Sequence, residues 1–396
     1  MQKITIVGAS LAGTSAAEAL RGAGYDGSIT LVDASPELPV DRPPLSKQVL
    51  AGTMEPDRAT LPAAHRLAEL DVTLRLGVRA AGLDVGTRTV TLADGSSVGA
   101  DGVVLATGSA PRRLDTDLAG VHVLRTLEDC LALRADLDAG PGRVLVVGAG
   151  FIGAEVAATC RGRGHEVTMV ETQPWPLQRV LPGEIGRFVA ELHTDEGVDV
   201  RLGVGVASIT GGSRVEQVIL TDGTTIEVDV VVAGIGVIPS VDWLRDSGLV
   251  LDNGVRCDET CLAAPGVVAA GDLCEWPNPL YGELMRVEQW ENAIEQGEHA
   301  ARRLLATDAE ASPFAPVPWF WSDQYDRKIQ LAGRVAATDR VEIVDGSIEE
   351  RRFVALFERA GRCVAVLGVN RPRHVAQLRM KMTEPLAWAD ALAHFA

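Results

Sequence analysis

The residues with the clearest chemical potential form two glycine-rich turns, about 140 residues apart. In the second turn, Gly148, Gly150 and Gly153 follow an apolar stretch, and Glu171 comes 171 − 148 = 23 residues after the first glycine. Such glycines let backbone N–H groups approach a pyrophosphate, and an acid after the next strand accepts ribose hydroxyls. A lone match is weak, because glycine turns also occur for purely structural reasons. The strand–turn–helix context here favours a dinucleotide site.

The first turn departs from this pattern at one position. Gly8 and Gly13 flank Ser10, which stands where the middle glycine is expected. Its side chain is small enough to fit, and its hydroxyl could bond a phosphate. Asp33, at 33 − 8 = 25 residues after Gly8, occupies the ribose position. Because the two turns occur together, we predict two dinucleotide sites, as an electron path between FAD and a nicotinamide cofactor requires.

Each turn belongs to a strand–helix–strand unit. The apolar periodicity predicts strands at 2–7, 28–33, 143–147 and 165–171, with helices at 14–24 and 154–164. After each unit, residues 72–108 and 198–236 alternate apolar and polar side chains around Asp-Gly turns, which predicts a β-meander closing with a buried strand. The fold class is therefore α/β with two Rossmann-like domains, and the long interval excludes a solenoid.

The remaining chain has a different pattern. We predict a strand at 267–272 and an amphipathic helix at 292–305. A proline-rich linker at 312–321 leads into a last module, with antiparallel strands at 330–335, 341–346, 351–358 and 362–370 and a closing helix at 374–385. This pattern predicts a C-terminal α+β domain.

Composition excludes several classes of protein. The 396 residues carry 37 basic and 54 acidic side chains, a net charge of −17, which argues against nucleic-acid or anionic-membrane binding. No apolar run is long enough to span a membrane, and a signal peptide is the poorer interpretation of the apolar start. The six cysteines form no zinc pattern or C-x-x-C, so we expect free thiols, a cytoplasmic location and no metal site.

Four segments resemble one enzyme family. They are Asp41–Lys47 (DRPPLSK), Leu105–Gly108 (LATG), Ala270–Asp272 (AGD) and Pro318–Tyr325 (PWFWSDQY). Together they resemble FAD-dependent NADH:ferredoxin reductases of oxygenase systems, the putidaredoxin, rubredoxin and aromatic-dioxygenase reductase type, on a glutathione-reductase-like fold. The resemblance covers nearly the whole chain. It implies an FAD domain at 1–110 and 246–318, an inserted NAD domain at 111–245 and a C-terminal domain at 319–396.

The resemblance also implies roles for single residues. The FAD site would consist of Gly8, Ser10, Gly13, Asp33, Arg42, Lys47, Thr107, Gly108, Asp272, Glu288, Gln289, Trp290 and Trp321. The NAD site would consist of Gly148, Gly150, Phe151, Ile152, Gly153, Glu171 and Gly236. Lys47 and Glu155 would form a catalytic pair beside the flavin and nicotinamide. Judged alone, Lys47 reads as a solvated lysine, Glu155 as a favourable acid in a first helical turn, and Trp319 and Trp321 as core aromatics.

One absence separates this chain from disulfide reductases of the same fold. Residues 41–52 (DRPPLSKQVLAG) contain no cysteine, so the redox cysteine of those enzymes is missing. We therefore expect NADH to reduce FAD, and FAD to reduce a small iron–sulfur ferredoxin that supplies a cytochrome P450 or a ring-hydroxylating dioxygenase. The alternatives are a rubredoxin reductase, an NADH oxidase, and a flavin-holding redox sensor or interaction protein.

An acidic partner needs a local basic surface on so acidic a chain. Candidate residues end the 292–305 helix or follow the last strand. They are Arg302, Arg303, Asn370, Arg371, Arg373, His374, Arg379 and Lys381, together with Trp321. We expect them to form a docking rim, the alternative being scattered solvated charges.

Overall fold

The computed structural model of the protein describes residues 1–140, 142–178 and 180–396. The chain divides into two compact units. The first consists of Met1–Asp41, Thr60–Ala110 and Pro239–Phe320, and the second of Arg42–Ala59, Pro111–Ile238 and Trp321–Ala396. This two-way division does not test the three predicted domain boundaries, which stay predictions.

A mostly parallel sheet forms the core of the first unit. Its strand order is β19-β20-β7-β1-β2-β3, and only β19 runs antiparallel to its neighbour. The strands are β1 (Lys3–Val7), β2 (Ser28–Val32), β3 (Val72–Arg75), β7 (Gly102–Leu105), β19 (Leu262–Ala264) and β20 (Val267–Ala269). The central strands are buried along nearly their whole length without alternation, as expected for strands covered on both faces.

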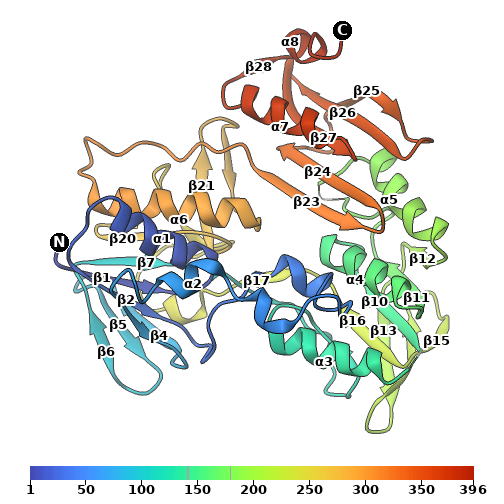
Figure 1. Ribbon diagram of the computed structural model, residues 1–396, viewed down its shortest axis with the longest axis horizontal. Helices are drawn as coiled ribbons and strands as arrows, with labels where there is room; N and C mark the ends of the chain where they lie inside the picture. The colour runs from blue at the N-terminus through green and yellow to red at the C-terminus, as the bar shows by residue number, and fades with distance from the viewer. Residues whose placement is uncertain (141, 179) are drawn as a thin grey trace. The chain divides into compact units, whose positions relative to one another are not determined.

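Two helices of the first unit pack closely against each other. Helices α1 (Leu11–Gly22) and α6 (Trp290–Leu305) lie side by side in Figure 1. The close approach depends on Gly297, because a Cβ atom there would lie 2.3 Å from the carbonyl oxygen of Ala12. Helix α1 also has small buried residues, such as Ala16 and Ala17. This packing fixes both helices above the sheet.

The remaining elements of the first unit are short. They are α2 (Pro62–Arg66), β4 (Ala80–Asp84), β5 (Thr89–Leu92), β6 (Ser97–Gly99), η3 (Asp242–Leu244), β18 (Val255–Arg256), β21 (Cys274–Asn278) and β22 (Glu283–Met285). The chain passes between the units at β8 (Ser109–Pro111) and β17 (Val237–Pro239).

The second unit repeats the plan with a parallel sheet ordered β12-β11-β10-β16-β9. Its elements are β9 (Val121–His122), α3 (Leu127–Asp138), β10 (Arg143–Val147), α4 (Phe151–Gly162), β11 (Glu166–Glu171), α5 (Gly183–Asp195), β12 (Asp199–Leu202) and β16 (Val230–Ala233). A meander of β13 (Val206–Gly211), β14 (Val215–Leu220) and β15 (Thr225–Glu227) precedes β16. Segment 42–59 joins this unit through the short helices η1 (Pro43–Ser46) and η2 (Pro56–Ala59).

The sequence prediction of the two meanders was partly wrong. Val72–Arg75 and Asp199–Leu202 were expected to open the meanders, but β3 pairs in parallel with β2, and β12 pairs in parallel with β11. Each parallel sheet therefore gains one strand, and each meander has three. Alternation predicts a half-covered strand but does not identify its neighbour.

The C-terminal module is an antiparallel sheet ordered β23-β24-β27-β26-β25, with β28 added to β27. Its elements are β23 (Trp319–Gln324), β24 (Arg327–Gly333), β25 (Arg340–Ser347), β26 (Arg352–Arg359), β27 (Arg362–Val369), α7 (Pro372–Lys381), β28 (Leu386–Ala387) and α8 (Trp388–Leu392). Helix α7 crosses the sheet at β24 and β27 (Figure 1). The end of the expected linker is therefore strand β23, and the closing helix stops at Lys381, short of its predicted end at residue 385.

Candidate functional site

The first glycine turn joins β1 to α1 with backbone packed directly on backbone. Gly8 has a φ of 109°, and a Cβ atom there would lie 2.2 Å from the carbonyl oxygen of Ala106. A Cβ atom on Gly13 would lie 1.8 Å from the carbonyl oxygen of Gly8. Neither position can hold a side chain without moving the turn, so both glycines are needed for its shape.

The start of helix α1 carries no side-chain cap. Ser10 is the N-cap residue in extended conformation, but its side chain makes no capping hydrogen bond, and the first turn has no acidic residue. Asp33 stabilises the turn instead, because its Oδ2 accepts from the Ala9 N–H at 2.6 Å and its Oδ1 from the Ser35 N–H at 2.8 Å. The first-turn N–H groups are thus left for an anion such as a pyrophosphate.

Other predicted FAD residues lie in the same unit. The Ser109 hydroxyl donates to Oδ2 of Asp272 at 2.7 Å. Thr107 donates to the carbonyl oxygen of Ser240 at 2.8 Å, and Gly108 has a φ of 65°. The loop after β7 and the loop after β20 are therefore joined by a hydrogen bond. Sequence reasoning missed Ser109, although it directly follows the LATG segment.

The N-terminus of α6 also lacks a side-chain cap. Gln289 is its N-cap residue, and Gln289 Oε1 is buried without a hydrogen-bond partner among the described residues. Trp290 donates its indole N–H to Oδ1 of Asp41 at 2.7 Å, and Glu288 pairs with Arg286 at 2.6 Å. A buried amide oxygen without a partner is costly unless something else bonds it. The uncapped α1, the tight glycine turn and this amide fit an FAD molecule.

The second turn reproduces the first. Gly148 has a φ of 98°, and a Cβ atom there would lie 2.5 Å from the carbonyl oxygen of Gly234. A Cβ atom on Gly153 would lie 2.0 Å from the carbonyl oxygen of Gly148. The Glu171 carboxylate accepts from the N–H groups of Ala149 and Gln173, each at 2.9 Å. The acid thus braces this turn in the manner of Asp33.

The approach to the second turn is open. A Cβ atom on Gly150 would contact only the Gly234 carbonyl oxygen, at 3.8 Å, and one on Gly236 would contact nothing within 4 Å. Helix α4 has no side-chain cap, and Ile152 in its first turn is 46% exposed although it is apolar. Phe151 beside it is half-buried. A helix start without a side-chain cap, next to an exposed apolar side chain, fits a dinucleotide.

Glu155 is the most tightly held acid of this region. It is 4% exposed, and its carboxylate accepts from Lys47 Nζ at 2.8 Å, Ser46 Oγ at 2.5 Å and Ser322 Oγ at 2.9 Å. Lys47 follows η1, Glu155 lies in α4 and Ser322 in β23, all in the second unit. Removing one partner from a buried ion pair costs about 3–5 kcal/mol. The cluster therefore holds a lysine ammonium in a fixed place.

The structure brings some predicted residues together and leaves others in separate units. The first unit contains Gly8, Ser10, Gly13, Asp33, Thr107, Gly108, Asp272, Glu288, Gln289 and Trp290. The second contains Arg42, Lys47, Glu155, Trp321 and the predicted NAD residues. Trp321 is half-buried at the start of this unit's part of β23. Sequence reasoning missed the serines at 46 and 322, although both stand inside the quoted motifs.

The predicted docking rim needs one correction. Arg303 is 8% exposed, because its guanidinium donates to Thr260 Oγ1 at 2.9 Å and pairs with Asp308 at 2.6 Å. A buried, paired arginine is part of the fold and not of a docking surface. Arg302 pairs with Glu298 one turn earlier on α6, at 2.9 Å. Arg302 stays exposed despite this pair, and Arg373 and Lys381 are the exposed basic residues of α7.

Comparison with known proteins settles the family. Residues 2–297 match the model of the pyridine nucleotide-disulphide oxidoreductases, and residues 319–392 match that of the reductase C-terminal domain. The chain belongs to the pyridine nucleotide-disulphide oxidoreductase family. Membership confirms the predicted resemblance, the fold class, the oxidoreductase assignment and the cofactors FAD and NAD(H).

Two relatives at more than 30% identity are named as reductases. The chain is 36% identical over 388 residues to rhodocoxin reductase of Rhodococcus erythropolis, which covers 96% of this chain and 90% of the relative. It is 38% identical over 395 residues to the ferredoxin–NAD(+) reductase component of the anthranilate 1,2-dioxygenase system of Burkholderia cepacia, covering 97% and 96%.

Two solved structures match over nearly the whole chain. The covalent putidaredoxin reductase–putidaredoxin complex matches with a TM-score of 0.91 and 33% identity, covering 96% of this chain and 93% of that one. The ferredoxin reductase for the CYP199A2 system from Rhodopseudomonas palustris matches with a TM-score of 0.92 and 35% identity, with both chains covered completely. Within the described residues, no helix has the length and apolar character to cross a membrane.

Proposed function

We propose that this protein is an NADH-dependent, FAD-containing ferredoxin reductase. It passes electrons from NADH through FAD to a small iron–sulfur ferredoxin, which supplies a cytochrome P450 or a ring-hydroxylating dioxygenase. The observation that carries the proposal is the pair of matching turns, each with two indispensable glycines and a carboxylate bonded to the turn. Two dinucleotide sites in one chain are what transfer between two cofactors needs.

The chain's own residues bind and orient. The turn at Gly8–Gly13 with Asp33 holds the adenosine end of FAD, and Asp272 with Ser109 holds its ribityl chain. The turn at Gly148–Gly153 with Glu171 holds NADH. Bound FAD supplies the conversion of two-electron chemistry into single-electron steps.

Lys47 and Glu155 orient the reacting end of the site. The buried carboxylate fixes the lysine ammonium, and two serine hydroxyls also donate to the carboxylate. A fixed ammonium stabilises negative charge that develops beside it, and it costs no reorganisation when the charge appears. Arg42 precedes the same short helix and contributes a second positive charge to this segment.

Two observations support a ferredoxin as the electron acceptor: the names of the relatives, and the absence of a cysteine from residues 41–52. One relative is named as the ferredoxin–NAD(+) reductase component of the anthranilate 1,2-dioxygenase system, and another as rhodocoxin reductase. Residues 41–52 contain no cysteine, so this segment offers no thiol relay. All six cysteines are buried free thiols, which supports a reducing, cytoplasmic location. The division into an FAD domain, an NAD domain and a C-terminal domain at the predicted boundaries is part of the proposal.

A coupled assay tests the proposal. Purified holoenzyme is mixed with NADH, cytochrome c and each member of a panel of purified [2Fe–2S] ferredoxins and rubredoxins. We expect reduction of cytochrome c that saturates with at least one [2Fe–2S] ferredoxin and is slow without it. Activity only with rubredoxins, or NADH consumption by O₂ that no carrier accelerates, would overturn the assignment. A protein that binds no FAD would overturn it at the first step.

A further inference from the structure

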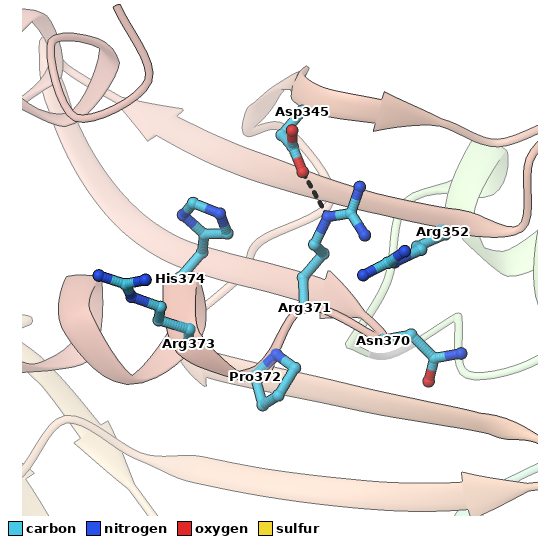
Figure 2. Close-up of a pocket in the computed structure, with 7 residues that line it drawn as sticks. All are labelled: Asp345, Arg352, Asn370, Arg371, Pro372, Arg373 and His374. Carbon is cyan, nitrogen blue, oxygen red and sulfur yellow. Dashed lines mark hydrogen bonds and ion pairs between the residues drawn. The ribbon is translucent and has the colours of Figure 1, made fainter.

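A basic cavity opens on the C-terminal module, and its lining contains none of the residues assigned to either dinucleotide. Its volume is about 370 Å³, and Figure 2 shows the side chains that line it. They include Asp345, Arg352, Asn370, Arg371, Arg373 and His374. Three arginines against one aspartate leave a formal charge of +2, with the histidine counted as neutral. A locally positive cavity on a chain of net charge −17 calls for an explanation.

The charges in the cavity are not balanced by the protein. Nε of Arg371 donates to Oδ2 of Asp345, and Figure 2 shows the guanidinium of Arg352 pointing toward that of Arg371. Nη1 of Arg371 is buried without a hydrogen-bond partner among the described residues. Arg352 is exposed, and within the same residues its side chain has no ion pair. Only one of the two guanidinium groups is thus paired with a carboxylate, and like charges held together repel unless an anion joins them.

The start of helix α7 adds donors to the same cavity. Its ten residues begin at Pro372, its N-cap Arg371 makes no side-chain cap, and its first turn has no acidic residue. The N–H groups of Arg373 and His374 therefore point out of the first turn, where the helix carries partial positive charge. The Asn370 side chain is engaged elsewhere, because its Oδ1 accepts from the Lys328 N–H and its Nδ2 donates to the Asp326 carbonyl oxygen. Its role is to hold the strand–helix corner, where its φ is 53°.

We propose that this cavity binds the phosphate group of a small molecule. A single guanidinium already satisfies a planar carboxylate, whereas a tetrahedral phosphate accepts donors from several directions. Here donors come from Arg352 and Arg371 on one side and from the α7 N-terminus on the other. The volume lies at the lower end of the range for small-molecule sites, roughly 300–1,000 Å³. The inference does not depend on the proposed electron transfer, because none of these residues belongs to a proposed cofactor site.

Calorimetric titration of the holoenzyme with inorganic phosphate tests the site. Saturating NAD⁺ fills the second dinucleotide turn, and chloride at matched ionic strength serves as the reference anion. The variant is Arg352→Gln, because this exposed side chain has no ion pair whose loss would disturb the fold. Arg362→Gln, an exposed arginine at the start of β27, is the matched control. We expect at least a tenfold weaker affinity for phosphate in Arg352→Gln and unchanged affinity in the control.

Titration with glycerol phosphate separates two sources of the same group. Tighter binding of the ester than of inorganic phosphate identifies an organic phosphate as the ligand, and the reverse identifies free phosphate. Either order supports the site if Arg352→Gln weakens both. The proposal is overturned if the parent enzyme binds phosphate no better than chloride, or if Arg352→Gln and Arg362→Gln bind it equally well.

Discussion

At the scale of a single residue, we predict that Glu171 sets the choice between NADH and NADPH. Its carboxylate is held by the N–H groups of Ala149 and Gln173 at the end of β11. A carboxylate there accepts the ribose hydroxyls of NADH and repels a 2′-phosphate. We predict that kcat/KM favours NADH by at least about tenfold, a difference of about 1.4 kcal/mol. Arg179, which follows Glu171 by eight positions in the sequence, lies outside the described residues.

Glu171→Gln should lower the ratio of kcat/KM for NADH to kcat/KM for NADPH, because the neutral amide no longer repels the 2′-phosphate of NADPH. Glu166→Gln, at the exposed start of the same strand, is the matched control and should keep the ratio of the parent enzyme. Steady-state kcat/KM values for both nucleotides measure the effect. Equal values for NADH and NADPH in the parent enzyme would refute the role of Glu171.

Some site residues were predictable from the sequence and others were not. The glycines and acids of the two turns were predictable, because their roles depend on spacing within one strand–helix–strand unit. Ser322 was not, because its function depends on Glu155, which lies 167 residues away in the chain. A serine has no chemistry of its own at this site until a buried carboxylate lies within hydrogen-bond distance. The prediction that Arg303 lies on the docking surface was wrong for the same reason. Its bonds to Thr260 and Asp308 cannot be inferred from its place at the end of a helix.

At the scale of the element, a matched pair of substitutions can test the two glycine turns separately. Gly13→Ala places a Cβ atom 1.8 Å from the Gly8 carbonyl oxygen, and Gly153→Ala places one 2.0 Å from that of Gly148. Each clash forces one turn open and leaves the other intact. We predict that Gly13→Ala loses FAD, measured as flavin absorbance per protein. Gly153→Ala should keep FAD but raise the KM for NADH at least tenfold.

The controls lie at the far ends of the same helices. A Cβ atom at Gly22, which ends α1, or at Gly162, which ends α4, would contact nothing within 4 Å. Alanine at these positions should leave FAD content and the KM for NADH unchanged. If Gly153→Ala instead loses FAD and keeps its NADH affinity, the two sites have been assigned the wrong way round.

Helix α5 carries a buried histidine that makes stability depend on pH. Burial lowers the pKa of His193 to about 4, below its usual 6.5. As the pH falls through 6.5, the unfolded chain binds a proton that the folded protein does not accept until near pH 4. The contribution of His193 to the free energy of unfolding is therefore fully present above pH 6.5 and is lost as the pH falls. The loss is about 1 kcal/mol at pH 5.5 and about 3 kcal/mol once the pH is below 4.

Urea unfolding of the holoenzyme at pH 7.5 and pH 5.5 measures this loss. His193→Gln removes the titrating group. Between pH 7.5 and pH 5.5, the free energy of unfolding should therefore decrease by about 1 kcal/mol less in this variant than in the parent protein. His65→Gln, at an exposed histidine, should retain the parent's pH dependence. Identical pH dependence in the parent and His193→Gln would contradict the role of His193.

The elements that sequence reasoning missed share a physical cause. Helices α3 and α5 were not predicted, although a capping box formed by Thr126 and Asp129 opens the first. Strands β3 and β12 were predicted with the wrong neighbours. The local pattern of apolar and polar residues indicates which face of a segment is covered. Which strand pairs with which, however, depends on residues that are distant in the sequence. The repeated βαβ units were predictable because strand, turn and helix follow one another directly.

At the scale of the whole molecule, charge decides how an acidic partner can approach. The protein carries −17, but helix α7 contains Arg373, Arg379 and Lys381 and no acidic residue. Such a local positive field steers an acidic ferredoxin, and salt screens it. We predict that Lys381→Glu slows ferredoxin-dependent turnover, most at low ionic strength. Ferricyanide reduction, which needs no docking, should be unchanged.

The control for docking is Arg245→Glu, which reverses an exposed charge outside the C-terminal module. It should leave ferredoxin turnover unchanged at every salt concentration. If Lys381→Glu slows ferricyanide reduction equally, the substitution damages the enzyme and α7 is not a docking surface. If neither activity changes, the ferredoxin binds elsewhere.

The central claim is that one chain converts the two electrons of NADH into single electrons for a ferredoxin. Anaerobic titration of the holoenzyme, with excess oxidised [2Fe–2S] ferredoxin and limiting NADH, tests it directly. Each hydride carries two electrons and each ferredoxin accepts one, so two ferredoxins should be reduced per NADH. The visible absorbance of the iron–sulfur cluster counts them. NADH oxidation that leaves the ferredoxin oxidised, or a slow reduction that does not depend on the enzyme, would contradict the account.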